Sequence, residues 1–245
     1  MMNQDNSRKI GMSTPTSILI GSVIIAAAII FSNLYLGISS RQVAENTDPS
    51  AIDERNIVMT PATEADHVYG SLQAKVLLIE YSDTECAFCK QMHPVIKKII
   101  DESKGEVGWV YRHFPLDSLH PKARIQAVAV ECAAELGGKE KFWEYLNELF
   151  QKVHVRDRAA AESERARAVE LSRIAAKIGL HKVKFAACLS SGKQEKNVED
   201  NYQDGVRIGI TGTPTIVLVN AKAEKKVFLG AQSEKVIKVA IEKLK

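Results

Sequence analysis

The first strong pattern in the chain is an apolar stretch without charged residues from Ile18 to Leu36. About 20 such residues are enough to cross a bilayer as a helix. Arg8 and Lys9 precede the stretch, and basic residues favour the cytoplasmic side of a membrane. We therefore predict a cytoplasmic segment over residues 1–16, a transmembrane signal anchor over residues 17–38, and export of the remaining chain.

A cleaved signal peptide is the alternative to a retained anchor. Gly37-Ile38-Ser39 offers small residues at a plausible cleavage spacing, but the apolar stretch is longer than the usual core of a signal peptide. The retained anchor predicts a single-pass protein of the cell (inner) membrane that faces the periplasm or the cell exterior, whereas cleavage predicts a secreted protein. Residues 39–65 are polar and mixed in charge, and they contain Pro49 and Pro61. We interpret this segment as a linker.

After the linker, apolar positions repeat first with the period of a strand and then with that of a helix. Val76–Tyr81 is an apolar, β-prone run bounded by polar residues. The residues beyond it predict a helix, because their apolar side chains recur at helical spacing: Phe88, Met92, Val95, Ile96 and Ile99. A second strand is predicted over Val107–Phe114.

A block of helices is predicted between this second strand and the C-terminal part of the chain. Its first helix closes at Gly137-Gly138, and another runs from Phe142 to Val153. The chain then ends with two strands and a helix, at Thr215–Val219, at Lys226–Leu229 and from Ser233 onward. This order predicts an α/β domain over residues 66–245 with a helical insertion at about 119–209.

Composition adds little beyond a size limit. The 245 residues suit one sizeable domain with additional segments. The 33 basic and 30 acidic residues nearly balance, giving a net charge of +3. Basic residues are scattered and no patch of interleaved basic and aromatic residues stands out, so nothing argues for nucleic-acid binding.

Candidate chemistry lies where the first strand becomes a helix, in Cys86-Ala87-Phe88-Cys89. Free backbone N–H groups and the positive end of the helix dipole stabilise a thiolate at the start of a helix, so we expect an exposed, nucleophilic Cys86. Cys89 lies on the helix stripe that turns inward. One reactive and one shielded sulfur, a turn apart, predict reversible dithiol chemistry. The alternatives are half of a zinc site or two incidental thiols.

Three stretches of the sequence resemble the thioredoxin superfamily and, more closely, DsbA-like thiol-disulfide oxidoreductases. They are Glu80–Lys90, which contains the cysteine motif, Arg112–Leu116, and Gly212-Thr213-Pro214-Thr215. The resemblance spans roughly Asp66 to the C-terminus. It implies a thioredoxin-like fold with an inserted helical subdomain, in which no cofactor and no metal takes part.

The resemblance also implies roles for three residues outside the cysteine motif. The proline that matches Pro214 is cis in this superfamily and packs beside the redox-active disulfide. Thr213, before it, then offers backbone groups to an incoming peptide, which can pair as an added strand. Glu80 matches an acid buried under the dithiol that helps to move the proton of the second cysteine, Cys89. On an alternating strand, Glu80 would instead be an ordinary surface residue.

The two remaining cysteines, Cys132 and Cys188, both lie in the predicted helical insertion, each on the inward stripe of its helix. An oxidising compartment would tend to join an even pair of this kind. Several DsbA-like proteins carry a second, structural disulfide in their insertion, which favours a Cys132–Cys188 bridge. Two buried, unpaired thiols are the alternative.

The function predicted from these features is a membrane-anchored thiol-disulfide oxidoreductase that introduces disulfides into reduced exported proteins through Cys86 and Cys89. The family resemblance implies a quinone-linked membrane partner that reoxidises this pair. A disulfide isomerase or reductase of the same fold is the alternative, since Ala87-Phe88 replaces the proline and histidine of the best-known DsbA proteins. A tethered metal-binding chaperone using Cys86, Cys89 and His93 is a third hypothesis.

Overall fold

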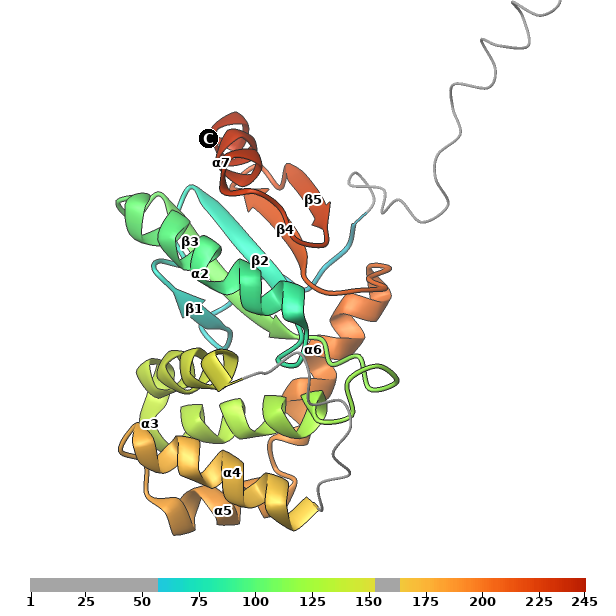
Figure 1. Cartoon of the computed structure of the whole chain (residues 1–245). Helices are drawn as coiled ribbons and strands as arrows, with labels where there is room; N and C mark the ends of the chain where they lie inside the picture. The colour runs from blue at the N-terminus through green and yellow to red at the C-terminus, as the bar shows by residue number, and fades with distance from the viewer. Residues whose placement is uncertain (1–56, 153–163) are drawn as a thin grey trace, which may run out of the picture. The chain divides into compact units, whose positions relative to one another are not determined.

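The structure, a computed structural model, describes residues 57–152 and 164–245 (Figure 1). The predicted cytoplasmic segment, the transmembrane anchor over residues 17–38 and most of the linker lie outside the described residues. Among the residues that are described, no helix is both long and apolar enough to cross a membrane.

A five-stranded mixed sheet forms the centre of the described domain (Figure 1). Its strands follow the spatial order β1-β3-β2-β4-β5, in which β2 and β3 are parallel and all other neighbours antiparallel. Their bounds are His67–Tyr69 for β1, Val76–Ser82 for β2, Val107–His113 for β3, Thr215–Asn220 for β4 and Lys225–Leu229 for β5. The sequence pattern predicts all of these strands except the three-residue edge strand β1.

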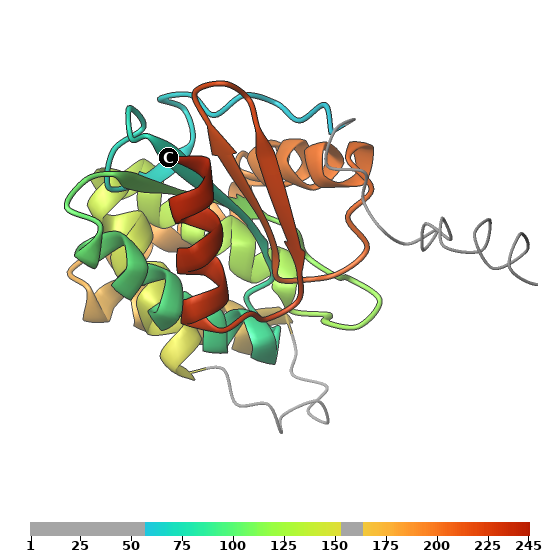
Figure 2. The same ribbon diagram turned by 90° about the horizontal axis from the view of Figure 1, so that it is seen from above.

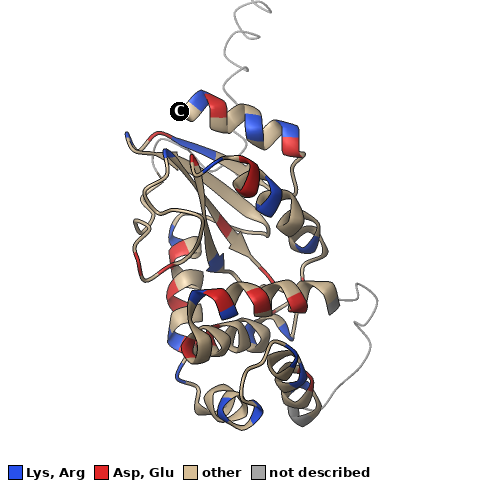
Figure 3. Ribbon diagram, turned by 90° about the vertical axis from the view of Figure 1, so that its left-hand side faces the viewer, with Lys and Arg blue, Asp and Glu red and all other residues tan. Residues whose placement is uncertain are grey.

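Helices α2 (Ala87–Glu102) and α7 (Glu234–Leu244) lie side by side on one face of the sheet (Figure 2). Ion pairs tie their exposed sides together, with Lys98 Nζ 2.9 Å from Glu234 and Lys238 Nζ 2.6 Å from Glu102. Both acidic and basic residues occur along the helices (Figure 3). The buried side of α2 contains Met92, Ile96 and Ile99 as expected, but Phe88 in its first turn is 57 % exposed.

Within the described residues, four helical segments lie between β3 and β4, which confirms a thioredoxin-like α/β fold with a helical insertion. They are α3 (Ala123–Lys152), α4 (Glu164–Lys177), α5 (Lys182–Ser191) and α6 (Glu195–Arg207). The α3 segment consists of two helices, because Gly138 has a φ of 74° and interrupts it. This left-handed conformation suits glycine, and it lies where the sequence predicts one helix to close.

Both faces of the central strands are covered, so the sheet separates two apolar cores. Leu78 and Trp109 belong to the larger core with α2, α3 and α7, whereas Ile79 and Val110 belong to a smaller core on the opposite side. All seven residues of β3 are buried, as are six of the seven in β2. No solvent-facing side remains for Glu80, which is completely buried.

Candidate active site

Cys86 is the N-cap residue of α2, at the carboxyl end of the central strand β2. Its position places the free N–H groups of the first helical turn, those of Phe88 and Cys89, around its sulfur. The sequence analysis expects an exposed Cys86, but only 5 % of this residue is accessible. The loop that contains Thr213 lies against it, with Cys86 Sγ 3.3 Å from the main-chain oxygen of Thr213.

The pKa of Cys86 is lowered to about 6. The largest cause is a hydrogen bond from the thiol of Cys89, and further donors are the side chain of Thr213 and the backbone N–H groups of Cys89 and Phe88; burial opposes them. Hydrogen bonds to a thiolate favour the ionised form. A thiol with such a pKa is largely ionised at neutral pH, and the thiolate is the nucleophilic form of cysteine.

Cys89 lies one turn further along α2 and is completely buried. Burial raises the pKa of its thiol well above the ordinary value, and the neighbouring Cys86 and Glu80 add to the effect. Both cysteines are free thiols in this structure. The pKa values of the two thiols are therefore shifted in opposite directions, lowered at Cys86 and raised at Cys89.

Glu80 lies on the same face of the sheet as this dithiol, and the indole Nε1 of Trp109 donates a hydrogen bond of 3.1 Å to its Oε2. Burial raises the pKa of Glu80 to about 8, despite that hydrogen bond. A carboxyl group with such a pKa can both donate and accept a proton near neutral pH. The sequence analysis did not identify Trp109; its position follows from the pairing of β2 with β3, where it lies opposite Leu78.

The Thr213–Pro214 peptide bond is cis. It directly precedes β4, which pairs with β2 so that Thr215 lies opposite Tyr81. Gly230 N donates to Pro214 O at 2.8 Å, which ties the loop to the end of β5. Strand pairing thus brings residues 213 and 214 beside Cys86, and the two ends of the domain meet at one site.

His93 is the third ligand in the metal-binding hypothesis, but its ring is engaged in other contacts. Its Nε2 lies 2.6 Å from Asn147 Oδ1, and its ring packs between Trp109 and Phe150, with centroids 5.0 and 4.9 Å away. Burial lowers the pKa of His93 to about 4. Within residues 57–152 and 164–245, no group of three His, Cys, Asp or Glu side chains is arranged to hold a metal ion.

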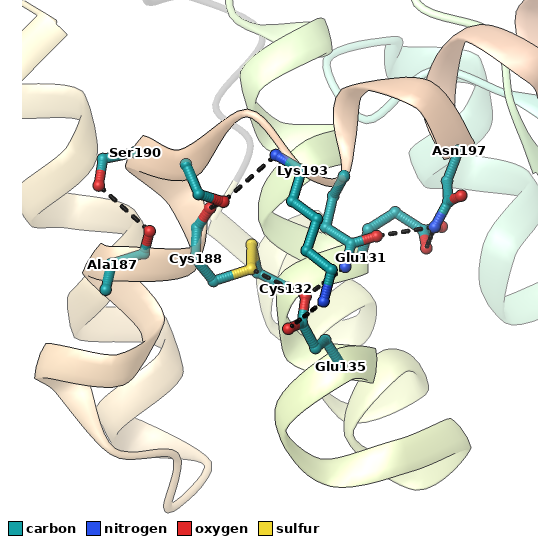
Figure 4. Close-up of a disulfide and its surroundings, with 10 residues drawn as sticks. Glu131, Cys132, Glu135, Ala187, Cys188, Ser190, Lys193 and Asn197 are labelled. Atoms are coloured by element: carbon teal, nitrogen blue, oxygen red, sulfur yellow. Dashed lines mark hydrogen bonds and ion pairs between the residues drawn. A yellow bond between two sulfur atoms is a disulfide. The ribbon is translucent and has the colours of Figure 1, made fainter.

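Cys132 of α3 and Cys188 of α5 are joined by a disulfide, with Cα atoms 5.8 Å apart (Figure 4). Cys132 is completely buried, whereas Cys188 is only partly buried, nearer the surface than its inward stripe suggests. Glu135 lies beside the bridge and accepts a hydrogen bond of 2.8 Å from Lys193 (Figure 4). The disulfide connects α3 with α5 and is separate from the Cys86–Cys89 pair.

A thioredoxin-like sheet with a nucleophilic cysteine at a helix start, a shielded partner cysteine and a neighbouring cis-proline loop defines the class of thiol-disulfide oxidoreductases. A model of the thioredoxin family matches residues 62–243. The chain therefore belongs to the thioredoxin family, and it is a DsbA-like member of the superfamily.

Solved structures and curated sequences are similar to this chain to different extents. DsbA2 of Pseudomonas aeruginosa is 26 % identical, with a TM-score of 0.60 over 75 % of this chain and 97 % of that protein. BdbD of Bacillus subtilis in its oxidised form shares the fold, with 23 % identity and a TM-score of 0.64 over 77 % and 97 % of the two chains. Among curated sequences, Na(+)/H(+) antiporter NhaA 1 of Mycolicibacterium gilvum is 32 % identical over 66 % of this chain.

That match covers 24 % of the antiporter. A similar match, 30 % identical, covers 62 % of this chain and 21 % of NhaA 3 of Salinispora tropica. The chain thus spans less than a quarter of the length of these curated relatives.

Proposed function

We propose that this protein is a membrane-anchored oxidase that introduces disulfides into exported proteins. The observation that supports thiol-disulfide exchange most directly is the lowered pKa of Cys86, about 6, and the resemblance to DsbA-like proteins favours the oxidase direction. A stabilised thiolate stabilises the reduced enzyme, and a stable reduced form makes the corresponding disulfide a stronger oxidant. Residues 17–38 provide the proposed anchor, with the catalytic domain facing the periplasm or the cell exterior.

The proposed reaction is a pair of thiol-disulfide exchanges. A substrate thiolate attacks Cys86 Sγ of the oxidised enzyme, a mixed disulfide forms, and Cys89 leaves with the electron pair of the broken S–S bond. The carboxyl group of Glu80 supplies a proton to this buried sulfur. A second thiolate of the substrate then attacks the mixed disulfide, so that the substrate leaves oxidised and the enzyme is left as a dithiol.

Two partners complete the proposed cycle. The substrates are reduced exported proteins, whose chains approach the sulfur along the Thr213–Pro214 loop. A quinone-linked membrane protein reoxidises Cys86 and Cys89, as the resemblance to DsbA-like proteins implies. Because Cys86 is only 5 % exposed beside this loop, an extended polypeptide segment fits the site better than the surface of a folded protein.

An isomerase or reductase of the same fold is the second candidate. The pKa of the nucleophilic cysteine is about 3.5 in the strong oxidant DsbA and about 7 in thioredoxin. Cys86, at about 6, lies between them and nearer to thioredoxin. The sequence Ala87-Phe88 between the cysteines agrees with a disulfide that oxidises less strongly than that of the best-known DsbA proteins.

The reduction potential of the Cys86–Cys89 pair, measured in glutathione buffers, separates these candidates. A value near about −120 mV supports an oxidase, whereas a value near about −270 mV supports a reductase. Membrane fractionation of the full chain and of a chain lacking residues 1–38 tests the anchor. Recovery of the full-length, uncleaved chain in the soluble fraction would contradict it.

A further inference from the structure

Asp83 lies in the turn between β2 and α2 and has a side chain with no exposed surface. Its carboxylate accepts three hydrogen bonds. Oδ1 accepts from the backbone N–H of Glu85 at 2.7 Å, and Oδ2 accepts from the backbone N–H of Leu116 at 2.7 Å. The third donor is Nδ1 of His120, 2.9 Å from Oδ2. Two of these three donors belong to the loop of residues 114–122, which follows β3.

The main chain of Asp83 reaches both active-site cysteines. Its N–H donates to Cys89 Sγ across 3.5 Å, and its carbonyl oxygen accepts from the N–H of Cys86 at 3.1 Å. Burial and the charges of Cys86 and Glu80 raise the pKa of Cys89, whereas the N–H of Asp83 lowers it. The residue thus contacts the sulfur that must leave as a thiolate.

We propose that Asp83 is a positioning residue for disulfide exchange: its carboxylate fixes the turn so that its own N–H donates to the departing Cys89 thiolate. The hydrogen bonds from Leu116 and His120 make this geometry depend on the docking of residues 114–122 against the turn. The inference rests on the proposed exchange at Cys86 and Cys89, but it does not depend on the direction of that exchange in the cell.

The chemistry of the leaving sulfur explains why one N–H matters. When a thiolate attacks Cys86 Sγ, the S–S bond breaks and its electron pair passes to Cys89, so negative charge develops on a buried atom. A lower pKa of the leaving thiol speeds this step, and a hydrogen bond from a backbone N–H lowers it. In the reverse direction, the same N–H lowers the cost of ionising Cys89 before it attacks.

The test measures how fast glutathione reduces the Cys86–Cys89 disulfide, by acid quenching, alkylation and mass spectrometry. Asp83→Asn keeps the size of the side chain, but its amide group cannot satisfy all three donors. We expect reduction to slow roughly tenfold, the factor for loss of one hydrogen bond to a charged group. The pKa of Cys86, measured by the pH dependence of alkylation, should stay near its wild-type value.

Glu85→Gln is the matched control. Glu85 lies in the same turn and contacts the same loop, since its Oε2 accepts from the backbone N–H of Lys122 at 2.6 Å. Like Asp83→Asn, this substitution removes one carboxylate near the cysteines. Glu85, however, does not carry the N–H that contacts Cys89. We expect its rate of reduction to equal that of the wild type.

The sign of the effect distinguishes positioning from simple electrostatics. If the carboxylate of Asp83 acted only through its charge, its removal would favour a nearby thiolate and speed reduction. Unchanged or faster reduction in Asp83→Asn, or equal slowing in Glu85→Gln, would overturn the inference. If the wild-type disulfide itself failed to exchange with glutathione, the proposed function would fail as well, which is a different result from loss of the Asp83 effect alone.

Discussion

The sulfur of Cys86 lies 3.3 Å from the main-chain oxygen of Thr213, although 127 positions separate the two residues in the sequence. Pairing of β2 with β4 brings them together, because each residue lies just beyond its strand at the same end of the sheet. A peptide that adds to the edge of this loop is placed directly beside the nucleophile. Cys86 and the Thr213–Pro214 loop therefore form a single site.

The two cysteines should differ in reactivity. Because the pKa of Cys86 is lowered to about 6 and that of Cys89 is raised, iodoacetamide should label Cys86 first, with a rate that rises through about pH 6. Cys86→Ser should abolish exchange, and Cys89→Ser should accumulate mixed disulfides with substrates. Preferential labelling of Cys89, located by peptide mass spectrometry, would contradict the assignment of the nucleophile.

Glu80 should make the stability of the protein depend on pH. Its pKa in the folded state, about 8, exceeds the ordinary value of 4.5, so the folded protein binds more protons between these values than the unfolded chain. The free energy of unfolding should therefore fall as pH rises from 4.5 to 8. Glu80→Gln should remove this part of the slope, as measured by urea denaturation at pH 4.5 and pH 8. An identical slope in the variant would show that Glu80 ionises normally.

The disulfide between Cys132 and Cys188 should stabilise the fold without taking part in exchange. It closes a loop with a sequence separation of 56, which corresponds to about 4 kcal/mol in the chain-entropy model. Replacing both cysteines with alanine should lower the unfolding free energy by up to about that amount and leave the exchange rate unchanged. Mass spectrometry of the non-reduced, alkylated protein should find both positions bridged; free thiols there would contradict the pairing.

Asp204 should be among the residues that matter most for stability on the side of the sheet away from the dithiol. Its Oδ2 lies 2.6 Å from Nη1 of Arg112, and both side chains are at most 4 % exposed. Asp204→Ala would leave the buried, positively charged guanidinium of Arg112 without this carboxylate partner. We therefore expect the free energy of unfolding, measured with a denaturant, to fall by about 3 kcal/mol.

Arg207→Ala is the matched control for this pair. Arg207 contacts the same carboxylate at 3.2 Å, but its side chain is 56 % exposed. A surface ion pair of this kind contributes only about 0–1 kcal/mol. Equal losses from Asp204→Ala and Arg207→Ala would show that the buried ion pair has no special role.

Local patterns in the sequence were sufficient to predict most of the fold. The apolar run before Cys86 and the helical spacing after it place a strand and a helix around the motif, and Gly138 lies where one helix closes. These features depend on residues that are close together in the sequence, so the periodicity of apolar residues is enough to predict them. The edge strand β1 has only three residues, too few to form a period.

Contacts between distant segments were decided by the tertiary structure. Glu131 of α3 accepts hydrogen bonds of 2.9 and 3.0 Å from His67 of β1 and His113 of β3, and no local pattern links these residues. Asp83 appears in the sequence only as part of a polar boundary after a strand. Its contacts with residues 114–122 arise because β2 and β3 are parallel neighbours and end at the same edge of the sheet.

The identity and spacing of Cys86 and Cys89 are enough to predict which atoms can react, because they set a dithiol at the start of a helix. How the reactivity of the two sulfurs is tuned depends on tertiary contacts. The pKa of each group depends on its burial and on donors that lie far away in the chain, such as Thr213 for Cys86 and Trp109 for Glu80. Solvent exclusion and hydrogen-bond geometry exist only once the sheet and helices have packed, so these properties cannot be read from local sequence.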